Sequence, residues 1–150
     1  MRILGYRFNS TTELRRKLQA KKFERDVIEA TVARLRNEHW LDDDRFAAAY
    51  VRTRALRKIG HLRIRRELIA AGIADDSADD AIRANIDPEV EEGELREVCD
   101  KRAKLLARRH GEDYLRTPQG RNKLAGYLLK QGYDAALVRS VLKEIKVAHH

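Results

Sequence analysis

Apolar positions recur with a helical period in three segments of the chain that align with one another without gaps. The segments cover residues 13–32, 63–82 and 123–142. Each begins with an aliphatic pair spaced four residues apart, at Leu14/Leu18, Ile64/Leu68 and Leu124/Leu128. Each then has an apolar or aromatic residue five positions later, at Phe23, Ile73 and Tyr133. Internal repetition of this kind is typical of one supersecondary unit used three times.

Each segment is predicted to fold as a helix, a tight turn and a second helix. The four-residue spacing places each aliphatic pair on one face of its first helix. Gly72 and Gly132 occupy the same repeat position, where a left-handed backbone would end that helix. The first segment has Lys22 there, and a lysine in this conformation costs about 1 kcal/mol relative to glycine. Ser10 and Glu13 have the spacing of a capping box.

A longer helix is predicted before the second and third segments. The first of these helices covers residues 42–58 and begins with acidic side chains, which suit a helix start. Its predicted apolar stripe consists of Phe46, Ala49, Tyr50, Thr53 and Leu56. The second covers residues 88–110, and its predicted stripe consists of Leu95, Val98, Cys99, Arg102 and Leu106. No stretch shows a clear two-residue alternation, so the chain is predicted to be all-α.

These elements predict three tandem three-helix repeats over residues 1–41, 42–86 and 87–148. The first repeat lacks or truncates its leading helix, and residues 2–6 are a candidate remnant of it. Trp40 ends the first repeat and is predicted to pack between repeats rather than to stack on a nucleic-acid base. The apolar stripes predict a core that includes Phe46, Tyr50, Ile64 and Leu68. Packing or turn positions are predicted for Tyr6, Tyr114, Tyr127 and Tyr133.

Composition excludes several classes of protein. With 43% hydrophobic residues among 150, the chain can bury a core. The one cysteine, Cys99, excludes an internal disulfide framework and a Cys-rich zinc site, and its apolar stripe predicts a buried, unreactive thiol. No apolar run approaches the roughly 18–20 residues that a membrane span needs, and the first ten residues do not resemble a secretory signal. A cytoplasmic protein is therefore expected.

Charge is segregated along the chain, which has 32 Lys+Arg, 24 Asp+Glu and a net charge of +8. Residues 45–66 contain no acid, and their basic side chains are the candidate binding residues: Arg45, Arg52, Arg54, Arg57, Lys58, Arg63, Arg65 and Arg66. Residues 73–97 carry ten acids against two arginines. A basic run is often only a solvated helix face, but this density favours attraction to a polyanion. Composition alone does not separate DNA phosphates from an acidic protein surface.

Several blocks of the sequence resemble a known family. The stretch LDDDRFA at residues 41–47, followed by Tyr50, Val51, Arg52 and Arg54, resembles the LDD-x-RFA-x-x-(Y/F) signature of the RecX family. Residues 63–68, RIRREL, and residues 13–18, ELRRKL, resemble two further blocks of that family. The family commonly has G-x-G-P before the second block, where this chain has Lys58, Ile59, Gly60 and His61. Loss of the proline removes a favourable residue from the first turn of a helix.

The resemblance implies both an architecture and a function. It implies an elongated, curved row of three three-helix repeats that together form one domain. It also implies a negative regulator that binds the RecA recombinase, lodges in the groove of the RecA–DNA filament, and suppresses its ATPase, coprotease and strand-exchange activities. We expect a monomer that uses no cofactor and no metal, with weak non-specific DNA binding as a further property.

Three rival interpretations remain open at this point. An enzyme is the least supported, because the sequence has no phosphate-binding glycine loop, metal-spaced ligand set or nucleophile elbow. The main alternative is a sequence-independent DNA-binding module without a RecA partner, and the third is a structural adaptor.

Within the candidate site, Arg45 is equally an ion-pair partner of the acids that begin its helix. Those acids, Asp42, Asp43 and Asp44, are assigned to the helix start rather than to Mg²⁺.

Overall fold

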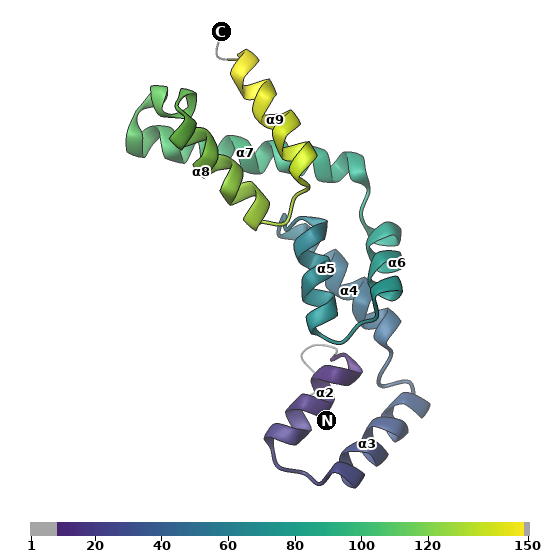
Figure 1. The fold of residues 1–150 in the computed structure, drawn as a ribbon. Coiled ribbons are helices and arrows are strands. Elements are labelled where there is room, and N and C mark those ends of the chain that lie inside the picture. The colour runs from purple at the N-terminus through teal and green to yellow at the C-terminus, as the bar shows by residue number, and fades with distance from the viewer. Residues whose placement is uncertain (1–8, 149–150) are drawn as a thin grey trace. The chain divides into compact units, whose positions relative to one another are not determined.

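The structure is a computed structural model that describes residues 9–148, and these residues are helical without any strand (Figure 1). The prediction of an all-α chain is confirmed. The helices are α2 (Thr11–Ala20), α3 (Arg25–Asn37), α4 (Asp43–Leu56), α5 (His61–Ala70), α6 (Asp75–Asn85), α7 (Pro88–His110), the 3₁₀-helix η1 (Glu112–Arg116), α8 (Pro118–Lys130) and α9 (Ala135–Ala148). Tyr6 and the candidate remnant helix at residues 2–6 lie outside the described residues.

Polar side chains cap the starts of several helices. The predicted capping box of α2 is confirmed: the Glu13 N–H donates to Ser10 Oγ at 3.0 Å, and the Ser10 N–H donates to Glu13 Oε1 at 3.2 Å. Asp87 accepts from the Glu89 N–H at the start of α7, and Thr117 accepts from the Gly120 N–H at the start of α8. Each cap satisfies a backbone donor that has no partner within its own helix.

The same turn ends five helices of the described chain. The predicted left-handed backbone is present at Gly72 (φ 89°), Gly132 (φ 104°) and Lys22 (φ 65°). The structure adds His39 (φ 64°) and Lys58 (φ 59°), which the repeat alignment did not indicate. After each of these residues, the next N–H donates to a carbonyl five positions back: Phe23 to Leu18, Trp40 to Leu35, Ile59 to Arg54, Ile73 to Leu68, and Tyr133 to Leu128. These are Schellman turns, which satisfy the last carbonyls of a helix.

The chain divides into two compact units, each with its own core. Unit 1 comprises residues 1–52 and 65–85, and unit 2 comprises residues 53–64 and 86–150. A cluster in unit 1 consists of Leu14, Ile28, Val32, Leu35 and Leu41. In unit 2, α7, α8 and α9 pack against one another around Leu95, Cys99, Leu106, Leu124, Leu128, Tyr133, Val138 and Val141. Cys99 is fully buried, and desolvation raises the pKa of its thiol to about 12.

The predicted stripe of α7 is confirmed, but that of α4 is partly wrong. In α4, Phe46, Ala47 and Val51 are buried, whereas Thr53 is exposed and Leu56 is 84% exposed. The three alanines at 47–49 do not distinguish one helix face from another, so the sequence pattern left the rotation of α4 undetermined. Tyr50 is half-buried, and its hydroxyl donates to Glu67 Oε1 at 3.0 Å.

Candidate functional site

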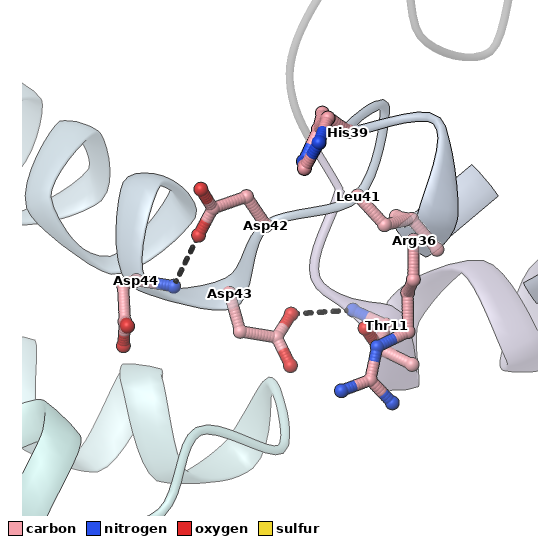
Figure 2. Close-up of a pocket in the computed structure, with 7 residues that line it drawn as sticks. All are labelled: Thr11, Arg36, His39, Leu41, Asp42, Asp43 and Asp44. Carbon is pink, nitrogen blue, oxygen red and sulfur yellow. Dashed lines mark hydrogen bonds between the residues drawn. The ribbon is translucent and has the colours of Figure 1, made fainter. Parts of the chain in front are cut away.

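The acidic triplet Asp42–Asp44 lines a recess of about 390 Å³ in unit 1, together with Thr11, Arg36, His39 and Leu41 (Figure 2). Asp42 Oδ1 accepts from the N–H groups of Asp44 and Arg45, each at 3.1 Å, and so caps α4. Asp43 Oδ1 accepts from the Thr11 N–H at 2.8 Å and ties the start of α2 to α4. The assignment of these acids to the helix start is confirmed. Within residues 9–148, no cluster of His, Cys, Asp and Glu could hold a metal ion.

Four of the eight candidate basic residues lie in unit 1, and three of them have identified partners. Arg45 Nη2 donates to the His39 carbonyl at 3.1 Å, and Arg52 Nη1 donates to Asn85 Oδ1 at 3.2 Å. Arg65 Nε forms an ion pair with Asp79 Oδ1 at 2.7 Å, and this hydrogen bond lowers the pKa of the Asp79 carboxyl. Arg66 is exposed, and its side chain has no hydrogen bond or ion pair within the described residues.

The other four candidates, Arg54, Arg57, Lys58 and Arg63, lie in unit 2. Lys58 pairs with Glu97 and lowers the pKa of that carboxyl by its hydrogen bond. Arg63 Nη1 donates to Gln131 Oε1 at 3.2 Å. Arg57 is exposed and, like Arg66, lacks a hydrogen-bonding side-chain partner in the part of the chain that is described. Arg54 is half-buried in the last turn of α4.

The acidic stretch at residues 73–97 therefore compensates part of the basic run. It supplies Asp79 to Arg65 and Glu97 to Lys58, and all four of these side chains remain more than a third exposed. Exposed pairs of this kind contribute little stability, so an anionic partner could displace the carboxylates. Arg57 and Arg66 need no such exchange, and both are exposed.

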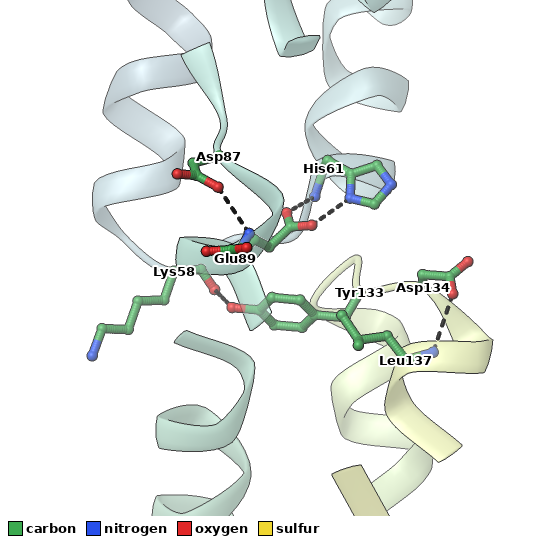
Figure 3. Close-up of polar contacts among 8 residues, drawn as sticks. Lys58, His61, Asp87, Glu89, Tyr133, Asp134 and Leu137 are labelled. Atoms are coloured by element: carbon green, nitrogen blue, oxygen red, sulfur yellow. Dashed lines mark hydrogen bonds and ion pairs between the residues drawn. The ribbon is translucent and has the colours of Figure 1, made fainter. Parts of the chain in front are cut away.

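A close backbone contact within unit 2 fixes the turn between α4 and α5, with Lys58 in the turn and Arg63 in the first turn of α5. The Gly60 N–H donates to the Gln131 carbonyl at 2.9 Å, and the Leu62 N–H donates to the Gly132 carbonyl at 3.0 Å. A Cβ at Gly60 would lie 2.3 Å from the carbonyl carbon of Gly132, so only glycine fits there. The buried Tyr133 hydroxyl donates to the Lys58 carbonyl at 2.8 Å (Figure 3).

Glu91 of α7 caps the start of α5 through His61. The His61 N–H donates to Glu91 Oε2 at 2.9 Å, and His61 Nδ1 lies 2.6 Å from Glu91 Oε1. The hydrogen bond to Glu91 raises the pKa of His61. Desolvation lowers this pKa, but the negative charges of Glu91 and Asp134 raise it further, so the net shift is upward. His61 stands where the RecX signature commonly has proline, which has no N–H to donate to such a carboxylate.

Sequence reasoning missed a second basic region in unit 2. Residues 114–133 contain no acid, and within them lie Arg116, Arg121, Lys123 and Lys130. The guanidinium carbon of Arg102, which was predicted only as a stripe residue, lies 4.4 Å from the ring centroid of Tyr127. A scan for acid-free segments would have found α8, but no sequence signal places Arg102 over Tyr127.

Trp40 departs from its predicted role, because its side chain is 57% exposed. The prediction that it packs between repeats is wrong. The Schellman turn at His39 directs the chain so that Leu41, and not Trp40, enters the core of unit 1. Phe23, at the equivalent position of the turn at Lys22, is likewise 50% exposed, whereas Ile73 and Tyr133 are buried.

The described residues define a class of protein: an all-helical protein whose candidate site consists of exposed and half-buried cationic side chains. None of the helices in residues 9–148 is long and apolar enough to cross a membrane. The particular family follows from comparison with known proteins.

Two sequence profiles match the chain, the first three-helix domain of RecX at residues 1–35 and the second three-helix domain of RecX at residues 42–82. The regulatory protein RecX of Xanthomonas campestris pv. campestris (strain B100) is 39% identical over 137 residues, which cover 91% of this chain and 79% of that protein. The regulatory protein RecX of Clostridium acetobutylicum is 35% identical over 141 residues, which cover 92% of this chain and 63% of that protein.

Solved structures show the same fold. The crystal structure of RecX from Lactobacillus salivarius matches with a TM-score of 0.75 at 24% identity, over 97% of this chain and 91% of that one. A second crystal structure of regulatory protein RecX matches with a TM-score of 0.74 at 25% identity, over 93% of this chain and 66% of that one. The chain belongs to the RecX family of regulatory proteins, which are not enzymes.

Proposed function

We propose that the chain is a negative regulator of the RecA recombinase. It binds the RecA–DNA filament and suppresses the ATPase, coprotease and strand-exchange activities of RecA. The observation that carries this proposal is membership of the RecX regulatory family, supported by 39% identity over 91% of the chain. The exposed cationic side chains support it physically, because a nucleoprotein filament presents both phosphates and acidic protein surface.

The proposed filament-binding residues are the basic run at residues 45–66: Arg45, Arg52, Arg54, Arg57, Lys58, Arg63, Arg65 and Arg66. Arg57 and Arg66 are expected to contribute most, because both are exposed and neither must first release a carboxylate within the described chain. Lys58 and Arg65 would exchange Glu97 and Asp79 for groups of the filament. Such an exchange is expected to weaken as salt screens the incoming charge.

The test compares R57E/R66E with wild type for binding to RecA filaments on single-stranded DNA and for inhibition of RecA ATPase. Charge reversal at two sites should weaken filament binding by at least about tenfold at low salt and by less at high salt. The matched control is R139E/K143E, which reverses the charge of two exposed cations on α9, outside the basic run. It changes the net charge of the protein by the same amount as R57E/R66E.

The outcomes separate the rival functions. Equal weakening by R57E/R66E and by R139E/K143E would reject the basic run as the binding residues. Equal wild-type affinity for bare DNA and for the filament, with RecA ATPase unchanged, would favour the sequence-independent DNA-binding module and reject RecA regulation. Circular dichroism of each variant establishes that the helices are intact.

A further inference from the structure

Arg102 of α7 carries a donor that the described structure leaves unused. Its Nε is buried and has no hydrogen-bond partner within residues 9–148. Its guanidinium carbon lies 4.4 Å from the centroid of the Tyr127 ring, a distance that fits a cation–π contact. A buried donor without a partner costs about 1–3 kcal/mol, so an unsatisfied group of this kind calls for a functional or structural explanation. The arginine side chain is therefore held against Tyr127, but its hydrogen-bonding capacity is not fully used within the described residues.

Tyr127 connects Arg102 to a second guanidinium in the same unit. The Tyr127 hydroxyl accepts from Gln131 Nε2 at 2.8 Å, and Gln131 Oε1 accepts from Arg63 Nη1 at 3.2 Å. Tyrosine and glutamine are neutral, so these bonds connect the two side chains without adding a negative charge between them. Arginine in a fixed orientation suits bidentate bonding to a planar or tetrahedral oxyanion.

The helix that carries Tyr127 adds further positive charge on the same side. Lys123 precedes Tyr127 by four residues and Lys130 follows it by three, so both share its helix face. Both lysines are exposed, and α8 contains no acidic residue. We call this set of residues the Tyr127 cluster: Arg63, Arg102, Lys123, Tyr127, Lys130 and Gln131.

We propose that the Tyr127 cluster binds the phosphodiester backbone of single-stranded nucleic acid. This inference deepens the proposed function, because it assigns the DNA of the filament to a site in unit 2. A phosphodiester is favoured over an acidic protein surface, because two exposed lysines, Lys123 and Lys130, flank the tyrosine, and lysine is depleted in the cores of protein–protein interfaces. Cations alternating with an aromatic ring are typical of sites that follow a single strand.

The test measures fluorescence anisotropy of a fluorescein-labelled oligothymidylate with the full chain, without RecA, across a salt series. R102Q should weaken binding by about tenfold at low salt and reduce the slope of log affinity against log salt by about 0.7 for each phosphate that is no longer neutralised. The matched control is K104Q, which removes one positive charge from an exposed position two residues along the same helix. K104Q should change affinity less than about twofold.

A second variant covers the case in which R102Q does not fold. K123Q/K130Q changes only exposed side chains, and it should weaken binding more than the double control K104Q/K143Q, whose two lysines are also exposed. Equal effects of R102Q and K104Q on oligothymidylate would overturn the proposal. Loss of filament binding by R102Q with unchanged oligothymidylate binding would also overturn it, assigning the cluster to RecA and leaving the proposed function intact. The reverse result is weakened oligothymidylate binding by R102Q with unchanged inhibition of RecA. It would support DNA binding by the Tyr127 cluster and would show that RecA inhibition does not depend on that binding.

Discussion

Single residues with a left-handed backbone end five of the helices, but glycine occupies only two of these positions. Repeat alignment predicted Gly72 and Gly132 and extended the prediction to Lys22. It did not predict His39 or Lys58, because those turns end helices outside the three aligned segments. A non-glycine residue adopts this conformation only where the surrounding contacts require it. The three non-glycine positions are therefore sites of local strain.

Replacing Lys22 by glycine should stabilise unit 1. Lys22 is exposed and its φ is 65°, so K22G removes left-handed strain and no buried contact. We expect the free energy of unfolding to rise by about 1 kcal/mol, measured by urea denaturation followed by circular dichroism. K21G is the matched control, because Lys21 has an ordinary φ of −84° and no left-handed strain to relieve. Glycine there only raises the conformational entropy of the unfolded chain, so K21G should not be stabilised. Stabilisation by both variants, or by neither, would contradict the strain argument.

At the scale of helices, the sequence predicted those elements that carry explicit start and stop signals. The helix predicted at residues 88–110 is observed with those bounds, since Asp87 and Pro88 begin it and Gly111 ends it. The helix predicted at residues 42–58 is shorter, because Lys58 takes a left-handed turn and α4 ends at Leu56. The buried face of α4 was missed because alanines flank its only bulky anchors. The division into repeats at 1–41, 42–86 and 87–148 stays a prediction.

The start of α5 shows a contact that sequence reasoning did not find. Loss of proline at His61 predicted a less favourable first turn, but the His61 N–H and imidazole both bind Glu91, thirty positions along the chain. Nothing in the local sequence identifies such a distant carboxylate as the cap. The interaction also makes α5 sensitive to pH, because the pKa of His61 is raised from its ordinary value of 6.5.

This sensitivity gives a prediction with a definite sign. Because the pKa of His61 is higher in the folded state, protonated His61 stabilises the folded protein. This contribution to the free energy of unfolding is fully present below the ordinary pKa and is lost as pH rises through the folded-state pKa. The difference in unfolding free energy between wild type and H61Q should therefore be larger at about pH 6 than at about pH 8.5. Urea denaturation at both values measures it. H110Q, which alters an exposed histidine stacked on Tyr114, is the control. A constant difference for H61Q would contradict the prediction.

At the scale of the whole chain, the sequence indicated where charge concentrates but not how much of it is internally paired. The segregated acidic stretch supplies partners to Lys58 and Arg65, whereas Arg57 and Arg66 remain unpaired within the described residues. Pairing depends on which helices come together, and one-dimensional charge counts do not contain that information. For the same reason, the Tyr127 cluster joins residues from α5, α7 and α8 that no short motif connects.

Three ion pairs join separate segments of the chain and should make it sensitive to acid. They are Arg65–Asp79, Lys58–Glu97 and Arg96–Glu144, the last with two contacts of 2.9 Å. In each pair the hydrogen bond from the cation lowers the pKa of the carboxyl. A lowered folded-state pKa gives stability that is present above the ordinary values, 3.8 for Asp and 4.5 for Glu, and is lost as pH falls through the folded-state pKa.

The free energy of unfolding should therefore fall between about pH 5 and pH 3, and more steeply at low salt. General repulsion contributes as well, because 32 Lys+Arg and 5 His face progressively fewer carboxylates. The variant D79N/E97Q/E144Q separates the two causes, since it removes the three paired carboxyls and retains the other acids. Its unfolding free energy should depend less on pH over this range than that of wild type. If both proteins lost stability with the same slope, repulsion alone would account for the acid sensitivity, and the three pairs would contribute nothing to it.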